Sequence, residues 1–177
     1  MYWIEGETGV TVSQMVQLFN SKEVQYPSEI MTKGGAETIE SFCEILIEEA
    51  TMEGIKAEVV FAQCMHETGW LQFGGDVKIE QYNFAGLGAT GNGVCGESFE
   101  DVRTGLRAQV QHLKAYASKK ELNNECVDVR FKYVNRNSAP FVEWLGQKEN
   151  PSGLGWAVQE KYGQKILYLI AILNEIE

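Results

Sequence analysis

The chain has 177 residues, of which 44% are hydrophobic and 23% are charged. That length fits one domain with its own core, and no segment approaches the roughly 18 consecutive apolar residues that a membrane span needs. The net charge of −10 disfavours nucleic acid as a partner, because phosphate binding depends on clustered Lys and Arg, and the 15 basic residues are scattered. The composition therefore predicts a single soluble globular domain over residues 1–177.

The cysteines indicate neither a metal site nor a disulfide framework. They are widely spaced and form no CxxC pair: Cys43, Cys64, Cys95 and Cys126. The first residues, MYWIEGETG, contain neither the basic nor the apolar segment of a secretory signal. We therefore expect either export by another route or a fragment of a longer protein.

The first third of the chain predicts an N-terminal arm and then a helix. The arm, residues 1–33, contains a short helix that Ser13 is expected to cap and that ends before Pro27. Residues 36–53 carry apolar side chains at helical spacing and acidic side chains on the other face. Gly54 fits the C-terminal end of this amphipathic helix.

The next helix, from about Lys56 to Glu67, is apolar nearly all round, which is typical of a buried central helix. Val60, Gln63 or Cys64, and Glu67 stand at positions i, i+3 or i+4, and i+7. This spacing places Glu67 on the inner face of the helix rather than on its solvent face.

The remainder predicts two more helices around a glycine-rich excursion. Glycines are dense over residues 69–96, which indicates irregular backbone or a short β-hairpin. Helical spacing returns at about 100–117, a single helical turn is expected near 141–145, and a last helix is expected within 160–176. The fold class is therefore mainly α with a small glycine-rich lobe.

Several catalytic classes are excluded by their missing motifs. His66-Glu67 begins like the zinc-protease motif HExxH, but Trp70 stands where the second histidine should be, and the only other histidine is His112. No GxSxG elbow is present, and the GLGATG segment lacks the Lys-Ser ending of a phosphate-binding loop. We expect no metal and no cofactor.

What remains is a carboxylic acid presented from an apolar helix beside glycines and aromatic rings. Burial raises the pKa of a carboxyl group, and glycosidic bond cleavage requires such an acid to protonate the leaving oxygen. Flat aromatic faces suit sugar rings, and six candidates follow or flank Glu67 in the sequence: Trp70, Phe73, Tyr82, Phe84, Trp156 and Tyr162.

The segments AQCMHETGW, NFAGLGATG, GLRAQVQHLKAYAS and GWAVQEKYGQKI resemble, in this order, the motifs of the bacterial glucosaminidase family. These enzymes are peptidoglycan-cleaving endo-β-N-acetylglucosaminidases with a lysozyme-like fold. The resemblance, which spans roughly residues 53–166, implies that Glu67 is the catalytic general acid. It also implies that Asn83 and Phe84 floor the cleft, that Tyr162 acts in glycan binding or catalysis, and that Trp156 lines the groove.

The chain departs from this family at two places. Members often have Asp-Pro before the last tyrosine, where this chain has Glu160-Lys161. Many also carry a second carboxylate on a β-lobe after the glycine-rich stretch, where Glu97 is the candidate, because Glu100 and Asp101 suit the first turn of the following helix. Two mechanisms stay open: the 2-acetamido group of the substrate attacks the anomeric carbon, or Glu97 or a neighbour activates water on a closing lobe in an inverting reaction.

The resemblance implies a hydrolase that cleaves the β-1,4 bond after N-acetylglucosamine in peptidoglycan, with Trp70, Tyr82, Asn83, Phe84 and Trp156 in contact with the glycan. A muramidase or lytic transglycosylase on the same fold is the first alternative, and a catalytically silent glycan-binding domain is the second. The expected partners are peptidoglycan strands, with a separate wall-binding module as a further expectation. A phage-type endolysin or a piece of a wall autolysin would fit the missing secretory signal.

Overall fold

The computed structural model describes residues 1–177 as a mainly helical protein with one small hairpin, which confirms the expected fold class. No helix is both long and apolar enough to cross a membrane. The α-helices are α1 (Val12–Asn20), α2 (Ser28–Lys33), α3 (Ile39–Glu53), α4 (Ala57–Thr68), α5 (Val102–Ala117) and α6 (Tyr162–Asn174). The short elements are η1 (Ile79–Gln81), β1 (Ala89–Gly91), β2 (Val94–Cys95), η2 (Phe131–Tyr133) and η3 (Val142–Leu145).

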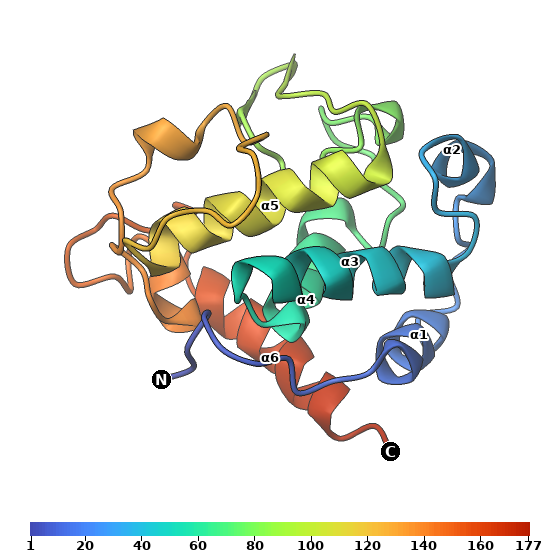
Figure 1. The fold of residues 1–177 in the computed structure, drawn as a ribbon, viewed down its shortest axis with the longest axis horizontal. Coiled ribbons are helices and arrows are strands. Elements are labelled where there is room, and N and C mark those ends of the chain that lie inside the picture. The colour runs from blue at the N-terminus through green and yellow to red at the C-terminus, as the bar shows by residue number, and fades with distance from the viewer.

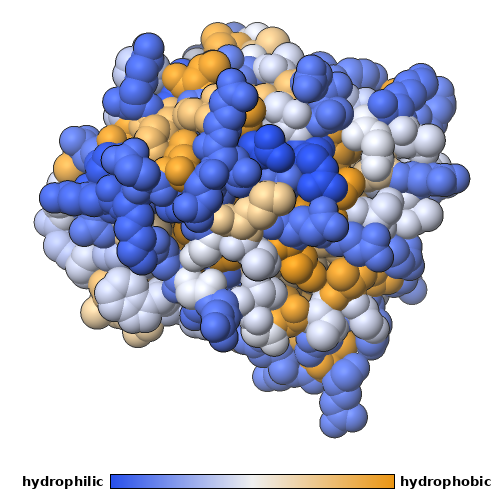
Figure 2. Space-filling view, in the orientation of Figure 1, coloured by the Kyte–Doolittle hydropathy of each residue, from blue (hydrophilic) through white to orange (hydrophobic).

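Helix α4 lies at the centre of the helical packing. It contacts α3, α5 and α6, while α3 also packs against α5 and α1 (Figure 1). The antiparallel hairpin of β1 and β2 and the loops around it lie at one side of α5. Polar residues cover most of the surface, and hydrophobic ones show between them in patches (Figure 2).

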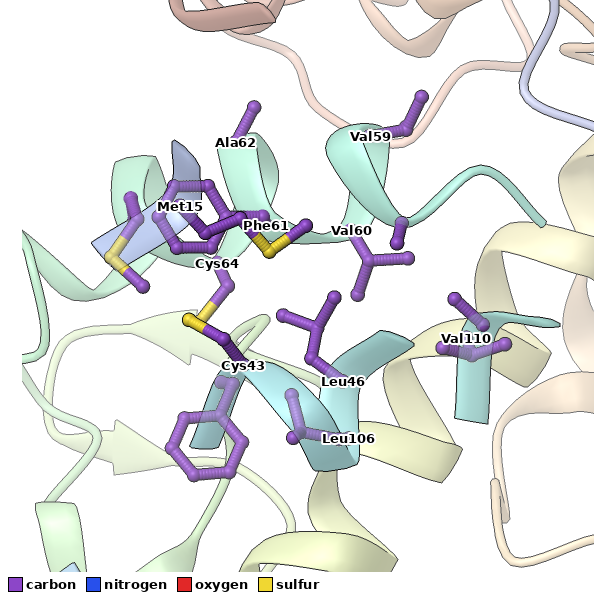
Figure 3. Packing of buried hydrophobic residues seen from close by; sticks show 14 of the residues in the cluster. Met15, Cys43, Leu46, Val59, Val60, Phe61, Ala62, Cys64, Leu106 and Val110 are labelled. Carbon is purple, nitrogen blue, oxygen red and sulfur yellow. The ribbon is translucent and has the colours of Figure 1, made fainter. Parts of the chain in front are cut away.

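From Ala57 to Met65 the side chains of α4 are buried all round, as the sequence predicts. Figure 3 shows Val60 pointing toward Leu46 of α3, whereas Val59 and Ala62 leave α4 in the opposite direction. All three α4 side chains are at most 1% exposed. The last turn of α4 is therefore fixed from several sides, which fixes the position of Glu67.

The N-terminal arm differs from the prediction in two details. Thr11, not Ser13, caps α1, because the Thr11 hydroxyl accepts from the Gln14 amide at 3.2 Å while the Gln14 side chain accepts from the Thr11 amide at 2.9 Å. Helix α2 is not predicted by the sequence, since Pro27 indicates a break in the helical pattern. Pro27 instead stands directly before α2, where a proline is compatible with a helix start.

The acidic face expected on α3 is only partly exposed to solvent. Glu49 is fully buried and pairs with Arg103 at 2.9 Å and Arg107 at 2.8 Å, both on α5. Glu53 is 2% exposed and pairs with Lys114 of α5 at 2.8 Å. Helical spacing could not reveal this, because the cations that pair with these acids lie more than 50 positions away in the sequence.

Glu53 is held in its charged form. Burial alone would raise its pKa, but hydrogen bonds from the Asn123 and Asn124 amides, together with the Lys114 ammonium, outweigh burial and lower the pKa. The folded pKa therefore lies below that of the unfolded chain. The stabilisation is complete above the ordinary glutamate value of 4.5 and is lost as the pH falls through the folded pKa.

We predict that Glu53→Gln lowers the free energy of unfolding by about 3–5 kcal/mol at neutral pH, because it leaves Lys114 buried without a counter-charge. Urea denaturation measures this change, and the difference from the wild type should shrink below about pH 4.5. Glu48→Gln is the control, because Glu48 is a 56%-exposed partner of Arg103 and should cost at most about 1 kcal/mol. Equal losses in the two variants would contradict the structural role of Glu53.

Candidate active site

Glu67 stands in the last turn of α4 and opens into a cavity of about 300 Å³. The expectation that it lies on the buried face needs correction, because its side chain is reached by solvent through this cavity. The helix ends at Thr68, so the face that is buried in earlier turns meets the cavity at the last turn. The residue as a whole is exposed, but the protein around its carboxyl group partly desolvates it, which raises its pKa.

A chain of hydrogen bonds holds the Glu67 carboxyl in place. The Tyr162 hydroxyl donates to Glu67 Oε1, and Gln63 Nε2 donates to the Tyr162 oxygen at 3.0 Å. Gln109 Nε2 in turn donates to Gln63 Oε1 at 3.0 Å. The three supporting side chains come from α6, α4 and α5 and are at most 2% exposed. The carboxyl orientation is thus set by three helices of the core.

Two opposing effects set the protonation of Glu67. Burial raises its pKa, and the Tyr162 hydrogen bond, which stabilises the carboxylate, lowers it in part, so the net shift is upward. The pKa of Tyr162 is raised well above its usual value by burial and by the neighbouring Glu67. Tyr162 therefore stays protonated and remains a donor. The site is suited to keep a proton on Glu67 at a pH where an ordinary glutamate is ionised.

A tight turn after α4 brings the chain back to Glu67. Trp70, Leu71 and Phe73 all have positive φ values near 60°, an uncommon conformation for side chains of this size. The Thr68 hydroxyl accepts from the Leu71 amide at 2.9 Å, and the Thr68 carbonyl accepts from the Phe73 amide at 2.8 Å. The turn lets Phe73 and Asp76 line the same cavity as Glu67.

Asn83 shapes the glycine-rich loop that forms the opposite wall. Its Nδ2 donates to the carbonyls of Leu87 at 2.9 Å and Glu97 at 3.0 Å, and its Oδ1 accepts from the Leu87 amide at 2.9 Å. This places Gly86 against the acid, since a Cβ on Gly86 would lie 3.9 Å from Glu67 Oε2. Asn83 lines the cavity, but its amide is engaged in holding the loop.

A second cavity of about 220 Å³ continues from the first. The two share Gly86 and Ala89, so they form one groove across the glycine-rich loop. Trp156 lines the second part and meets the His112 ring edge-on, with centroids 4.7 Å apart. His112 is held by Asp128 at 2.6 Å. Trp156 therefore lines the groove as expected, but in the second cavity rather than in the cavity of Glu67.

Tyr82 and Phe84 do not present ring faces to the groove, which corrects the expectation that they contact a glycan. Phe84 is fully buried between Phe42 and Phe73, and Tyr82 is 7% exposed with its hydroxyl bonded to the Ile30 carbonyl at 3.1 Å. Gly105 of α5 explains their burial, because a Cβ there would collide with the Tyr82 carbonyl. The loop lies directly on α5 and directs both rings into the core.

The structure brings Asp76, rather than Glu97, into the cavity of Glu67. Asp76 is half-buried and forms no ion pair, whereas Glu97 lies against Gly88 with Arg130 at 3.9 Å. No local pattern in the sequence marks Asp76, since only the turn after α4 brings it to the cavity of the acid. The Gln63–Gln109 pair was likewise not predicted, although a glutamine on the inner face of an apolar helix is a signal of a buried polar network.

As expected, Asp101 has a structural role at the start of α5, where its carboxylate accepts a hydrogen bond from the Thr104 amide at 2.7 Å.

Trp70 is half-buried and lies outside the cavity of Glu67, in a neighbouring hollow beside α6. Of the expected site residues, Glu67 and Asn83 thus line one cavity, the buried Tyr162 is hydrogen-bonded to Glu67, and Trp156 lies in the continuation of the cavity. No group of three or more His, Cys, Asp or Glu side chains is arranged to hold a metal ion.

A carboxyl group of raised pKa beside a cavity is the arrangement that glycosidic bond cleavage requires, and sequence comparison supports the class of glycoside hydrolases. Residues 43–175 match the glucosaminidase family, described as mannosyl-glycoprotein endo-β-N-acetylglucosaminidase. The chain is also 37% identical over 152 residues to an uncharacterised protein of Borreliella burgdorferi, covering 86% of this chain and 71% of that protein. The protein therefore belongs to the glucosaminidase family.

We predict that Tyr162→Phe raises the pKa of Glu67 above its wild-type value, because the lost hydrogen bond favours the ionised form. NMR titration of the Glu67 carboxyl carbon measures the shift directly. Tyr133→Phe, at a 68%-exposed position, is the control and should leave the titration unchanged. A Glu67 pKa that stays constant or falls in Tyr162→Phe would show that the tyrosine does not stabilise the carboxylate.

Proposed function

We propose that this protein is an endo-β-N-acetylglucosaminidase that hydrolyses the β-1,4 bond after N-acetylglucosamine in bacterial peptidoglycan. The family supports a glycosidase, and the observation that carries the proposal is Glu67, an acid of raised pKa held by Tyr162 at a groove. Two cavities meet at Gly86 and Ala89, and such an extended site suits an enzyme that cleaves within a polymer.

In this mechanism, Glu67 is the general acid. Its proton moves to the glycosidic oxygen as the bond to the anomeric carbon breaks, and the resulting carboxylate accepts the Tyr162 hydrogen bond. The tyrosine thus stabilises the product state of this proton transfer. Because the acid must start protonated, activity falls as the pH rises through the raised pKa of Glu67.

Asp76 is the second carboxylate of the proposed reaction. It lines the cavity of Glu67, and no cation neutralises it, so its charge is available to a water molecule. Asp76 accepts a proton from that water while the water oxygen bonds to the anomeric carbon, and the leaving sugar keeps the proton from Glu67. Glu97, the residue suggested by the resemblance, faces Arg130 instead.

The glycan lies along the groove across the glycine-rich loop. Trp156 offers a half-buried aromatic face beside this path, and Gly86 and Ala89 allow the sugar to approach the backbone closely. Phe73 adds an apolar wall next to the acid. Asn83 acts indirectly, since it keeps the loop in the shape that leaves the groove open.

The reaction is tested by digesting purified peptidoglycan, reducing the products and identifying the reduced sugar by mass spectrometry. We predict N-acetylglucosamine at the new reducing ends, and a loss of about 10³-fold or more in rate for Glu67→Gln. The exposed Glu80→Gln is the matched control and should retain full activity. Reduced N-acetylmuramic acid would indicate a muramidase and anhydro-muramic ends a lytic transglycosylase. Binding without cleavage by the wild type would indicate a glycan-binding domain.

A second comparison separates the two candidate carboxylates. We predict that Asp76→Asn lowers kcat by about 10²- to 10⁴-fold, whereas Glu97→Gln changes it by less than about threefold, because only Asp76 shares the cavity of the acid. The variants are assayed on the same glycan after their melting temperatures are checked. The reverse result would assign the role to Glu97, and full activity in both would indicate attack by the substrate's own 2-acetamido group.

A further inference from the structure

A hollow of about 440 Å³ adjoins the catalytic cavity on the other side of Gly69, which lines both. Its walls come from the end of α4, the turn after it and the first two turns of α6. The volume lies in the range of about 300–1,000 Å³ that small-ligand sites occupy. The proposed reaction makes no use of it.

The walls combine aromatic faces with positive charge. Trp70 is half-buried and Tyr168 is 67% exposed, and Lys161 and Lys165 complete the lining, which contains no acidic residue. The ammonium of Lys22 lies 4.9 Å from the centre of the Trp70 ring. In a chain of net charge −10, two lysines that line one hollow and a third over its tryptophan are a marked local exception.

None of these three lysines forms an ion pair within the protein, although the Glu149 carboxylate accepts a hydrogen bond from the Lys161 backbone amide at 2.8 Å. The lysines that form ion pairs are others: Lys33, Lys114, Lys120 and Lys148. The charge of Lys165 acts on His66, which also lines the hollow. Burial is the larger cause of the lowered His66 pKa, and the Lys165 charge is the second. The lining of the hollow therefore combines lysine ammonium groups that form no ion pair with apolar surface, which favours a ligand that is both anionic and partly apolar.

We propose that this hollow binds the acidic peptide substituent of the glycan strand, with its carboxylates at Lys161 and Lys165 and its methyl groups on Trp70 and Tyr168. The inference rests on the proposed function, because peptidoglycan carries short carboxylate-bearing peptides on alternate sugars. Gly69 joins the hollow to the cavity of Glu67, so a peptide held here is attached to a sugar next to the bond being cleaved. The site thus selects peptide-substituted glycan over naked glycan.

The test uses two soluble glycans prepared from the same peptidoglycan, one with its peptides and one stripped of them by an amidase. We predict that the wild type has a lower KM for the peptide-bearing glycan. Lys161→Met/Lys165→Met should raise that KM about tenfold while leaving kcat on it, and both constants on the stripped glycan, unchanged. Added salt should weaken the wild-type preference, because exposed charge pairs are screened.

The matched control is Lys119→Met/Lys132→Met, which removes the same two charges from exposed positions away from the hollow. It should keep the wild-type preference. Equal KM values of the wild type on the two glycans, or the same loss in both double variants, would overturn the peptide site and leave the proposed function standing. A wild type that cleaves neither glycan would overturn the proposed function and, with it, this inference.

Discussion

The hydrogen bond from Tyr162 to Glu67 is the interaction on which the site depends. It joins the first residue of α6 to the last turn of α4, two elements separated by 95 positions in the sequence. Gln63 and Gln109 extend it through the core to α5. A buried polar chain of this kind is stabilising only when its members are paired, so any displacement of α6 or α5 would leave donors or acceptors unsatisfied. The acid is therefore positioned by the packing of the whole helical core.

The second constraint is the close approach of the glycine-rich loop to both a helix and the acid. Gly105 lets the Tyr82 carbonyl rest on α5, and Gly86 leaves space in front of Glu67. The side-chain amide of Asn83 forms two hydrogen bonds with the backbone of Leu87 and so holds the loop in shape. The loop can thus be tight without being covered by a helix, and the groove stays open across it.

Sequence periodicity predicted the elements whose stability comes from one apolar face or from burial all round. Helices α3, α4, α5 and α6 follow directly from such spacing, and Gly54 follows α3 in the left-handed conformation that a helix end favours. Helix α2 was missed because six residues carry too little periodicity to outweigh a proline. The single turn of η3 was found, since its apolar residues stand between loop segments.

Features that depend on partners distant in the sequence could not be predicted in this way. Glu49 has the spacing of a surface acid, and only the position of α5 shows that it is buried. Tyr82 and Phe84 have the ring type that sugars prefer, but Gly105 draws them into the core. Asp76 carries no local signal at all. Glu67 could be singled out from the sequence because a carboxyl at the end of an apolar helix is a local arrangement, whereas Tyr162 and Asp76 come close to it only through the fold.

In the proposed reaction, the position of Glu67 would meet two opposing demands. A general acid must be reached by a polymer, yet its proton is retained at neutral pH only if the carboxylate is poorly solvated. A glutamate inside α4 would be dry but inaccessible, and one in the glycine-rich loop would be accessible but fully hydrated. The last turn of α4 offers both conditions, because the core lies behind the carboxyl and a cavity lies in front. Tyr162 then limits how far the pKa rises, so that the proton is held loosely enough to be given to the leaving oxygen.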